Sequence, residues 1–254
     1  MPVQKIVLAD HLGVFVDDVF CAPSAYNTGT VIFSAVSYSL QIYLDFSGYS
    51  DMAIGIAKII GFDFNPNFNL PYMARGSSDF WSRWHISLST WFKDYLYIPL
   101  GGSRRGEKRT YINLFIVMLV SGFWHGAGWS FILWGCMHGM ANCVTRWLRN
   151  KNIQENAVLR GMEVLCIFLL VTLFWTVFRA ESIEKAGVYW NAMFTSHSGI
   201  SQPYTWTFVA IICLTAVTLI AMRRARKNKI ACINGFYPIL DLSKIWSLVK
   251  FLLS

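Results

Sequence analysis

Residues 111–145 read YINLFIVMLVSGFWHGAGWSFILWGCMHGMANCVT and contain no Asp, Glu, Lys or Arg. Basic clusters flank this run on both sides, so by the positive-inside rule it leaves the cytoplasmic face of a membrane and returns to it. Two complete spans need about 40 residues. The pattern therefore predicts a short helical hairpin whose bend, SGFWHGAGW, lies within the membrane thickness, because Gly122, Gly126 and Gly128 allow the backbone to break there.

The composition of the whole chain is typical of a membrane protein. Of the 254 residues, 55% are hydrophobic and 14% are charged, and the mean hydropathy is +0.42, whereas a soluble domain has about a quarter charged residues. These values exclude a solvated enzyme and a disordered tail. The net charge of +8 comes from basic residues grouped between apolar runs, which indicates membrane topology and not nucleic-acid binding. Three clusters are expected on the cytoplasmic side: Arg104, Arg105, Lys108 and Arg109; Arg146, Arg149 and Lys151; and Arg223, Arg224, Arg226, Lys227 and Lys229.

Further apolar runs predict additional membrane helices. Residues 19–44 carry no charge and include TVIFSAVSYSLQIYL, which is long enough for one span. Two more spans are predicted by VLCIFLLVTLFWTVF (164–178) and WTFVAIICLTAVTLIAM (206–222). The shorter GYSDMAIGIAKIIGF (48–62) predicts a re-entrant or internally packed segment, and residues 236–254 predict an amphipathic helix or a partial span. We expect residues 1–254 to form a single all-α membrane domain, a polytopic bundle with interfacial and re-entrant helices.

Residues 63–102 combine aromatic, basic and turn-forming residues and predict an interfacial region. Ser78 is a candidate N-cap residue. One apolar helical face is predicted to follow it and to end before Pro99, with members that recur at spacings of three and four: Phe80, Trp84, Leu88, Trp91 and Tyr95.

Three of the five histidines are candidates for chemistry. His125 occupies the glycine-rich bend of the uncharged hairpin, where an ionisable group is a functional hypothesis, although a neutral imidazole bonded to a helix carbonyl is the alternative. His138, between Gly135 and Gly139, fits packing and function about equally well, and His85 in SRWHISLSTWF is a weak signal by itself. His11 and His197 lie in terminal or polar segments and are interpreted as bystanders.

Other chemical classes lack the motifs that they need. The six cysteines show no CxxC spacing, and no HxxH or HxxxH spacing links the histidines, so we expect neither a disulfide framework nor a metal site. The sequence also contains no GxSxG elbow, phosphate-binding loop or dinucleotide fingerprint, so nothing in it supports serine-nucleophile, nucleotide or redox chemistry.

Three long motifs, however, resemble a known family. YLDFSGYSDMAIGIAKIIGF, NFNLPYMARGSSDFWSRWHISLSTWFKDYLYIPLGGSRRG and SGFWHGAGWSFILWGCMHG occur in this order and are similar to the membrane-bound O-acyltransferases, most of all to the bacterial branch that includes alginate O-acetyltransferases. The resemblance implies that His125 in the WHG motif is catalytic and that His85 in the RWH motif lines the same path. It also implies a multi-pass protein of the bacterial inner membrane.

The function implied by the resemblance is transfer of an acyl group, most simply acetyl, from a cytoplasmic donor toward an exported polysaccharide such as alginate or another cell-envelope glycan. Imidazole suits this chemistry because it removes a hydroxyl proton or carries the acyl group near neutral pH. His85 is then expected to orient the donor or to hydrogen-bond its thioester carbonyl. The expected acyl donor is acetyl-CoA or an acyl carrier, with no bound cofactor.

The expected partners are membrane lipids, the acyl donor and a periplasmic or extracytoplasmic acetyltransferase, with no nucleic acid. The basic cluster from Arg104 to Arg109 either attracts an anionic donor or serves only topology and lipid headgroups. Family members are nearly twice as long as this chain, which resembles their C-terminal half and is expected to lack their N-terminal helices. Two alternatives therefore stay open, a transport or scaffold protein without covalent chemistry and an inactive truncated fragment.

Overall fold

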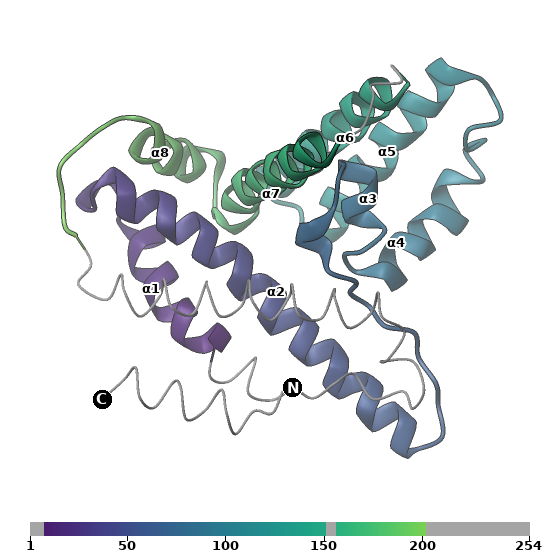
Figure 1. Ribbon diagram of the computed structural model, residues 1–254, viewed down its shortest axis with the longest axis horizontal. Coiled ribbons are helices and arrows are strands. Elements are labelled where there is room, and N and C mark those ends of the chain that lie inside the picture. The colour runs from purple at the N-terminus through teal and green to yellow at the C-terminus, as the bar shows by residue number, and fades with distance from the viewer. Residues whose placement is uncertain (1–7, 151–155, 202–254) are drawn as a thin grey trace. The chain divides into compact units, whose positions relative to one another are not determined.

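A computed structural model of the protein describes residues 8–150 and 156–201, which fall within one compact unit, Met1–Ser201. The regular secondary structure of this part of the chain is helical, apart from an isolated bridge between Tyr26 and Ile200 (Figure 1). The expected all-α class is therefore confirmed. The predicted span at 206–222 and the predicted amphipathic end at 236–254 lie outside the described residues.

The first helices differ from the prediction in their boundaries. The 19–44 run begins in α1 (Asp10–Cys21), passes through the short η2 (Pro23–Ala25) and enters α2 (Thr28–Ile59), where the Asn27 side chain accepts a hydrogen bond from the Thr30 amide at 2.8 Å. The segment predicted at 48–62 as re-entrant or internally packed is not a separate element, because α2, which is 32 residues long, continues through it as far as Ile59. Asp51 and Lys58 are carried on this helix and do not end it, and its length is about 48 Å.

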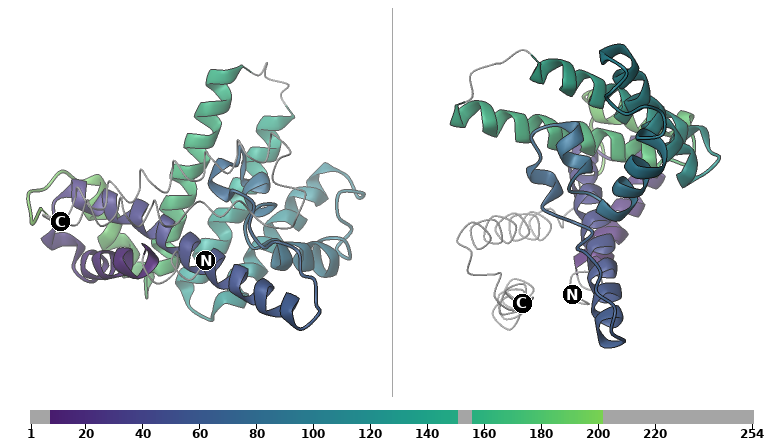
Figure 2. Two further views of the ribbon diagram at one scale, coloured as in Figure 1. Left: turned by 60° about the horizontal axis from the view of Figure 1, so that its bottom comes forward. Right: turned by 90° about the vertical axis from the view of Figure 1, so that its right-hand side faces the viewer.

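The helices of the predicted hairpin are confirmed as α5 (Glu107–His125) and α6 (Trp129–Arg149), which lie side by side in both views of Figure 2. The two helices touch through glycine. A Cβ atom on Gly122 would lie 3.1 Å from Cα of Gly135, and one on Gly135 would lie 2.6 Å from the carbonyl oxygen of Met118. Small residues allow membrane helices to approach this closely.

Helix α7 (Ala157–Arg179) confirms the span predicted at 164–178 and packs against both α2 and α6. Among the helices of residues 8–150 and 156–201, it is the one that is both long and apolar enough to cross a membrane by length and composition. The Ser39 hydroxyl of α2 donates to the Thr172 hydroxyl of α7 at 2.9 Å. Helix α8 (Ile183–Phe194) then returns to α2, where the hydroxyls of Tyr189 and Ser34 are 2.7 Å apart.

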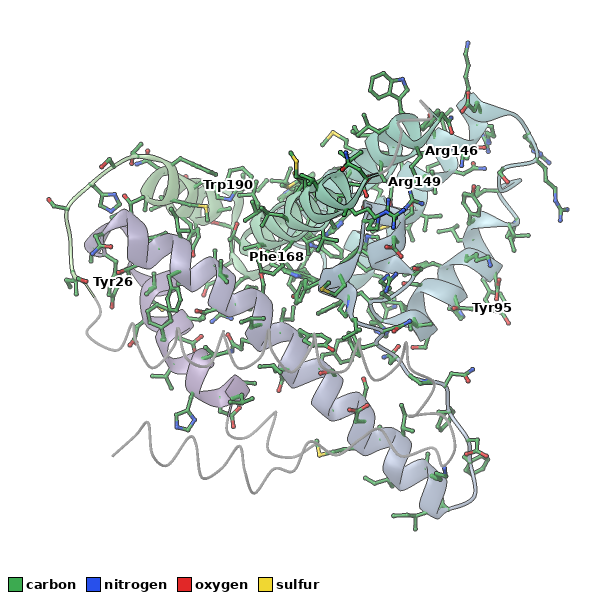
Figure 3. The ribbon with its side chains drawn as sticks, in the orientation of Figure 1. Tyr26, Tyr95, Arg146, Arg149, Phe168 and Trp190 are labelled. Atoms are coloured by element: carbon green, nitrogen blue, oxygen red, sulfur yellow. The ribbon has the colours of Figure 1, made fainter. Side chains whose placement is uncertain are left out.

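The single interfacial helix predicted from Ser78 is wrong. The chain instead forms η3 (Pro71–Met73), α3 (Ser77–Trp81), α4 (Ile86–Phe92) and a π-helical turn, η4 (Lys93–Tyr97), and Gly76 is the N-cap of α3. The predicted apolar face is divided between two environments, because Phe80 and Trp84 are buried whereas Trp91 and Tyr95 are 52% and 69% exposed. Tyr95 lies at the outer edge of the protein in Figure 3.

Backbone pairing explains the break between α3 and α4. The Asn69 amide donates to the Arg83 carbonyl at 2.8 Å, and the Ile86 amide donates to the Asn67 carbonyl at 2.9 Å. These bonds to a distant loop replace helical ones and leave His85 with a φ of 44° and a ψ of 55°, in the left-handed region. A continuous helix cannot pass through a residue in that conformation.

Candidate functional site

His125 is the last residue of α5, directly before the glycine that opens the hairpin bend. Its half-buried imidazole lies against aromatic side chains from α6 and α7. The ring centroids of His125 and Trp134 are 5.2 Å apart with the planes at 90°, and those of His125 and Phe178 are 5.1 Å apart at 86°. Three helices therefore meet at this histidine, at the end of the hairpin away from its basic clusters.

His138 lies one helical turn beyond Trp134 on α6 and is fully buried. The indole nitrogen of Trp81 donates to its Nδ1 atom at 3.3 Å, and the rings of Trp134 and Phe174 lie with their centroids 4.8 Å from the His138 centroid. For this residue the structure favours the packing interpretation over the functional one, because the imidazole is enclosed by aromatic rings.

His85 lies at the break between α3 and α4, and its ring meets Phe46 of α2 edge-on, with centroids 4.7 Å apart. The residue is half-buried, and this burial lowers the pKa of His85. Its imidazole is therefore neutral near pH 7. The Nδ1 atom of the ring lies 3.4 Å from Oδ1 of Asn67 and 3.4 Å from Oγ of Ser87.

The two predicted site histidines belong to one aromatic assembly. Trp84 precedes His85, its ring centroid is 5.0 Å from that of Trp175, and Trp175 stacks on Trp134 with a centroid separation of 5.8 Å. Trp134 in turn contacts His125. We call these three indoles the tryptophan cluster. His85 also lies close enough to His125 to interact with it electrostatically, so the structure brings both histidines to the same region.

Polar contacts fasten α3 to its neighbours. Ser78, the predicted cap, instead donates to the Asn142 side chain of α6 at 3.2 Å. Asp79 accepts hydrogen bonds from Nε of Arg83 at 2.7 Å and from the Arg75 amide at 2.9 Å. Burial alone would raise the pKa of Asp79, but these two bonds and the Arg83 charge lower it below the usual value.

A second ion pair ties this region to α7. Nε of Arg75 lies 2.7 Å from a carboxylate oxygen of Glu163, with both side chains about one third exposed. The entry to α3 is thereby held between α6 and α7. The segment that leads to His85 is therefore bound to both α6 and α7, and these contacts restrict its movement.

The basic clusters of the hairpin lie at its other end. Arg104 and Arg105 precede α5, Arg146 and Arg149 end α6 (labelled in Figure 3), and the Asn150 side chain donates to Glu107 at 2.5 Å across the two helices. Arg104, Arg105 and Arg149 are exposed. The hairpin thus presents positive charge at one end and His125 at the other.

Within residues 8–150 and 156–201, no three His, Cys, Asp or Glu side chains are grouped as metal ligands. The residues at the site that sequence reasoning missed are Asn67 and Trp134. Asn67 stands in the loop NPNFN, where nothing marks it as a partner of His85. Trp134 stands nine residues after His125, a separation that brings the two together only because the chain reverses between α5 and α6.

Comparison with known proteins identifies the family of this chain. The model of MBOAT, the membrane-bound O-acyltransferase family, matches residues 22–177, which include both site histidines. A probable alginate O-acetylase of Azotobacter vinelandii is 46% identical over 193 residues, covering 76% of this chain and 38% of the relative. A peptidoglycan O-acetyltransferase of Helicobacter pylori is 44% identical over 72% of this chain and 35% of its own length.

A more distant relative is a teichoic acid D-alanyltransferase of Bacillus subtilis, 34% identical over 52% of this chain and 36% of the relative. The chain spans less than two fifths of the length of these curated relatives. The family match extends from the start of η2 almost to the end of α7 and takes in the hairpin, the break at His85 and the tryptophan cluster. This chain belongs to the membrane-bound O-acyltransferase family.

Proposed function

We propose that this chain carries the catalytic part of an O-acyltransferase that passes an acetyl group toward an exported cell-envelope polysaccharide. The observation that carries the proposal is the position of His125 at the end of α5, held by Trp134 and Phe178 beside the hairpin bend. The second histidine, His85, lies within electrostatic range of it. Acyl transfer to a hydroxyl needs a base of this kind.

The proposed reaction exchanges a thioester for an ester. The hydroxyl oxygen of the acceptor attacks the thioester carbonyl carbon, and the new C–O bond forms as the C–S bond breaks. His125 takes the hydroxyl proton and returns it to the departing thiolate, so the imidazole ends in the state in which it began. His85 contacts the reactants beside it and orients them.

The proposed setting is the bacterial inner membrane, which the chain crosses several times with its basic clusters on the cytoplasmic side. The donor, acetyl-CoA or an acyl carrier, approaches the basic end of the hairpin near Arg104 and Arg149, because both kinds of donor are anionic. The acceptor glycan approaches from the other face, where the expected extracytoplasmic acetyltransferase is placed to bind the same glycan. Membrane lipids surround the exposed apolar side chains of α7, such as Leu165 and Leu169.

The proposed acceptor is alginate or a related glycan. The relatives with the longest coverage are named for alginate and peptidoglycan O-acetylation, whereas the more distant ones are named for teichoic acid D-alanylation. The higher identity to the first group favours acetyl as the group that is moved.

A transfer assay tests this proposal. Membranes containing the protein are supplied with radiolabelled acetyl-CoA and an alginate oligosaccharide, and the label on the oligosaccharide is counted. His125→Ala should abolish the transfer, and His11→Ala is the matched control because His11 is an exposed residue of α1. Full transfer by His125→Ala at normal abundance would refute the catalytic assignment and favour a transport or scaffold role.

A further inference from the structure

The surroundings of His85 determine which of its ring nitrogens carries the proton. Nδ1 of His85 faces Oδ1 of Asn67 and Oγ of Ser87, both at 3.4 Å. The backbone amide of Ser87 donates to the same Asn67 atom at 3.0 Å. Because an amide N–H only donates, Asn67 must present its carbonyl oxygen at this point and not its NH₂ group.

The hydroxyl of Ser87 leads to the same conclusion. Its Oγ atom lies 3.0 Å from Oδ1 of Asn67. The Asn67 oxygen has no proton, so the Ser87 hydroxyl proton lies between these two oxygens. Ser87 therefore turns a lone pair toward His85. Both neighbours of Nδ1 are acceptors, which means that Nδ1 carries the proton of the neutral imidazole and Nε2 carries a lone pair.

Asn67 is itself held in place. Its side-chain nitrogen donates to the Ser50 hydroxyl of α2 at 3.4 Å, and its backbone carbonyl accepts from the Ile86 amide at 2.9 Å. These contacts stabilise the left-handed backbone of His85, a conformation that persists only when the surroundings impose it. Such imposed conformations cluster at functional sites.

Nε2 of His85, in contrast, points away from this network. It makes no hydrogen bond within the described part of the chain, and it is not among the fully enclosed polar atoms there. Phe46 covers one side of the ring, and His125 lies within electrostatic range. Nε2 is therefore the atom of His85 that is left for a reactant.

We propose that Asn67 is a positioning residue that holds His85 as the Nδ1–H tautomer, so that Nε2 offers a hydrogen-bond acceptor to the substrate. This rests on the proposed acyltransferase function and sharpens it. An unprotonated Nε2 cannot donate a hydrogen bond to a thioester carbonyl. It accepts a hydrogen bond from a hydroxyl of the acceptor sugar next to the reacting one, whose proton goes to His125.

Nitrogen NMR of the protein labelled with ¹⁵N-histidine in lipid bilayers tests the tautomer directly. The His85 signals are assigned by their loss in His85→Gln. The wild type should show a protonated Nδ1 and an unprotonated Nε2 at His85. An Nε2–H signal in the wild type would overturn the proposal, whether or not any variant folds.

Three variants distinguish a positioning role of Asn67 from a purely structural one. Asn67→Asp keeps an acceptor oxygen and should preserve the Nδ1 proton. Because its carboxylate also favours the charged imidazole, its turnover should rise toward the wild-type value as the pH is raised. Asn67→Leu removes the oxygen and should lose the Nδ1–H signal and lower kcat roughly ten- to hundredfold, by analogy with residues that orient metal-ligating histidines. Asn191→Leu is the matched control, because it makes the same substitution at an exposed asparagine of α8 and should leave the tautomer and the turnover unchanged.

The outcomes also separate this proposal from the function on which it rests. An unchanged tautomer in Asn67→Leu, or an unchanged kcat with the tautomer lost, would overturn the role of Asn67. Absence of acetyl transfer by the wild type would instead refute the proposed function, while the nitrogen signals of His85 would still decide the tautomer.

Discussion

Gly122 and Gly135 face each other across the hairpin so closely that a Cβ atom on either would lie within 3.2 Å of the other's Cα. The obstructing atoms belong to backbone, which cannot rotate away as a side chain can. The separation of α5 and α6 is therefore fixed by the absence of these two side chains. His125 follows Gly122 by one helical turn and takes its position from the same contact.

We predict that Gly122→Ala or Gly135→Ala forces the two helices apart, destabilises the protein by about 1 to 3 kcal/mol as overpacking does, and lowers acetyl transfer. Thermal unfolding in detergent and the transfer assay measure the two effects. Gly161→Ala in α7 is the control, because nothing lies within 4 Å of the added atom. Equal stability of all three variants would show that the helices tolerate a wider separation.

The histidines should divide into catalytic and structural ones when they are replaced. His125→Ala should abolish transfer and leave the amount of protein in the membrane unchanged, because the half-buried residue lies at the bend. His85→Ala should reduce transfer less severely. His138→Ala opens a fully buried cavity and loses the bond from Trp81, so it should cost about 2 to 4 kcal/mol of stability. Quantitative immunoblots and transfer rates distinguish these patterns.

That ranking fails if His125→Ala protein disappears from the membrane, since His125 would then be structural. It fails equally if His138→Ala accumulates normally and loses only activity.

Topology gives a third prediction. In a cysteine-free background, cysteines placed at Arg104, Arg149 and Arg226 should resist a membrane-impermeant reagent applied to intact cells, because short basic loops stay in the cytoplasm. A cysteine at Ser182, directly after α7, should react. Arg104 and Arg149 are at the same end of the hairpin, so labelling of only one of them would contradict the arrangement of α5 and α6.

Asp79 provides a prediction for pH. Its folded-state pKa is lowered from 3.8 by Arg83 and the Arg75 amide, against the effect of burial. The carboxylate therefore stabilises the folded protein above the unfolded pKa, and this stability is lost as the pH falls through the lowered value. Asp79→Asn should cost about 1 kcal/mol at pH 7, since the side chain is partly exposed, and should lose less stability than the wild type on acidification below pH 4.

The control for this experiment is Glu181→Gln. Glu181 pairs with Lys185, but both side chains are exposed, so its removal should leave unfolding unchanged at either pH. A similar acid sensitivity in the wild type and Asp79→Asn would mean that other carboxylates govern acid unfolding.

The parts of the fold that could be predicted are those determined by local sequence. Residues 111–145 predict the hairpin because a charge-free run between basic clusters has few alternatives, and the glycines mark its bend. The prediction of one continuous helix from Phe80 to Tyr95 was wrong, because aromatic residues at spacings of three and four occur on both buried and exposed helical faces. The break at His85 depends on backbone bonds to Asn67 and Asn69, 18 and 16 residues before His85, and nothing in the sequence pattern marks these bonds.

The candidate site, too, could be predicted only in part from the sequence. His125 and His85 were recognised through long motifs that resemble a family, and their proximity was implied by that resemblance. The interaction of Asn67 with His85 was not predictable, because neither residue's neighbours indicate that α2, the loop and α4 meet there. For His138, packing and function were equally good interpretations of the sequence, and the enclosing rings that favour packing come from distant parts of the chain.

The neighbours of His125 also set an order of assembly during synthesis. Trp134 follows it by nine residues, so this contact forms as soon as the hairpin closes, at low cost in chain entropy. Phe178 follows His125 by 53 residues, and the Arg75–Glu163 pair joins residues 88 apart. The hairpin therefore closes before Phe178 leaves the ribosome, and the contact between His125 and Phe178 is added afterwards. A ribosome stalled before Phe178 emerges holds a formed hairpin with an unfinished site.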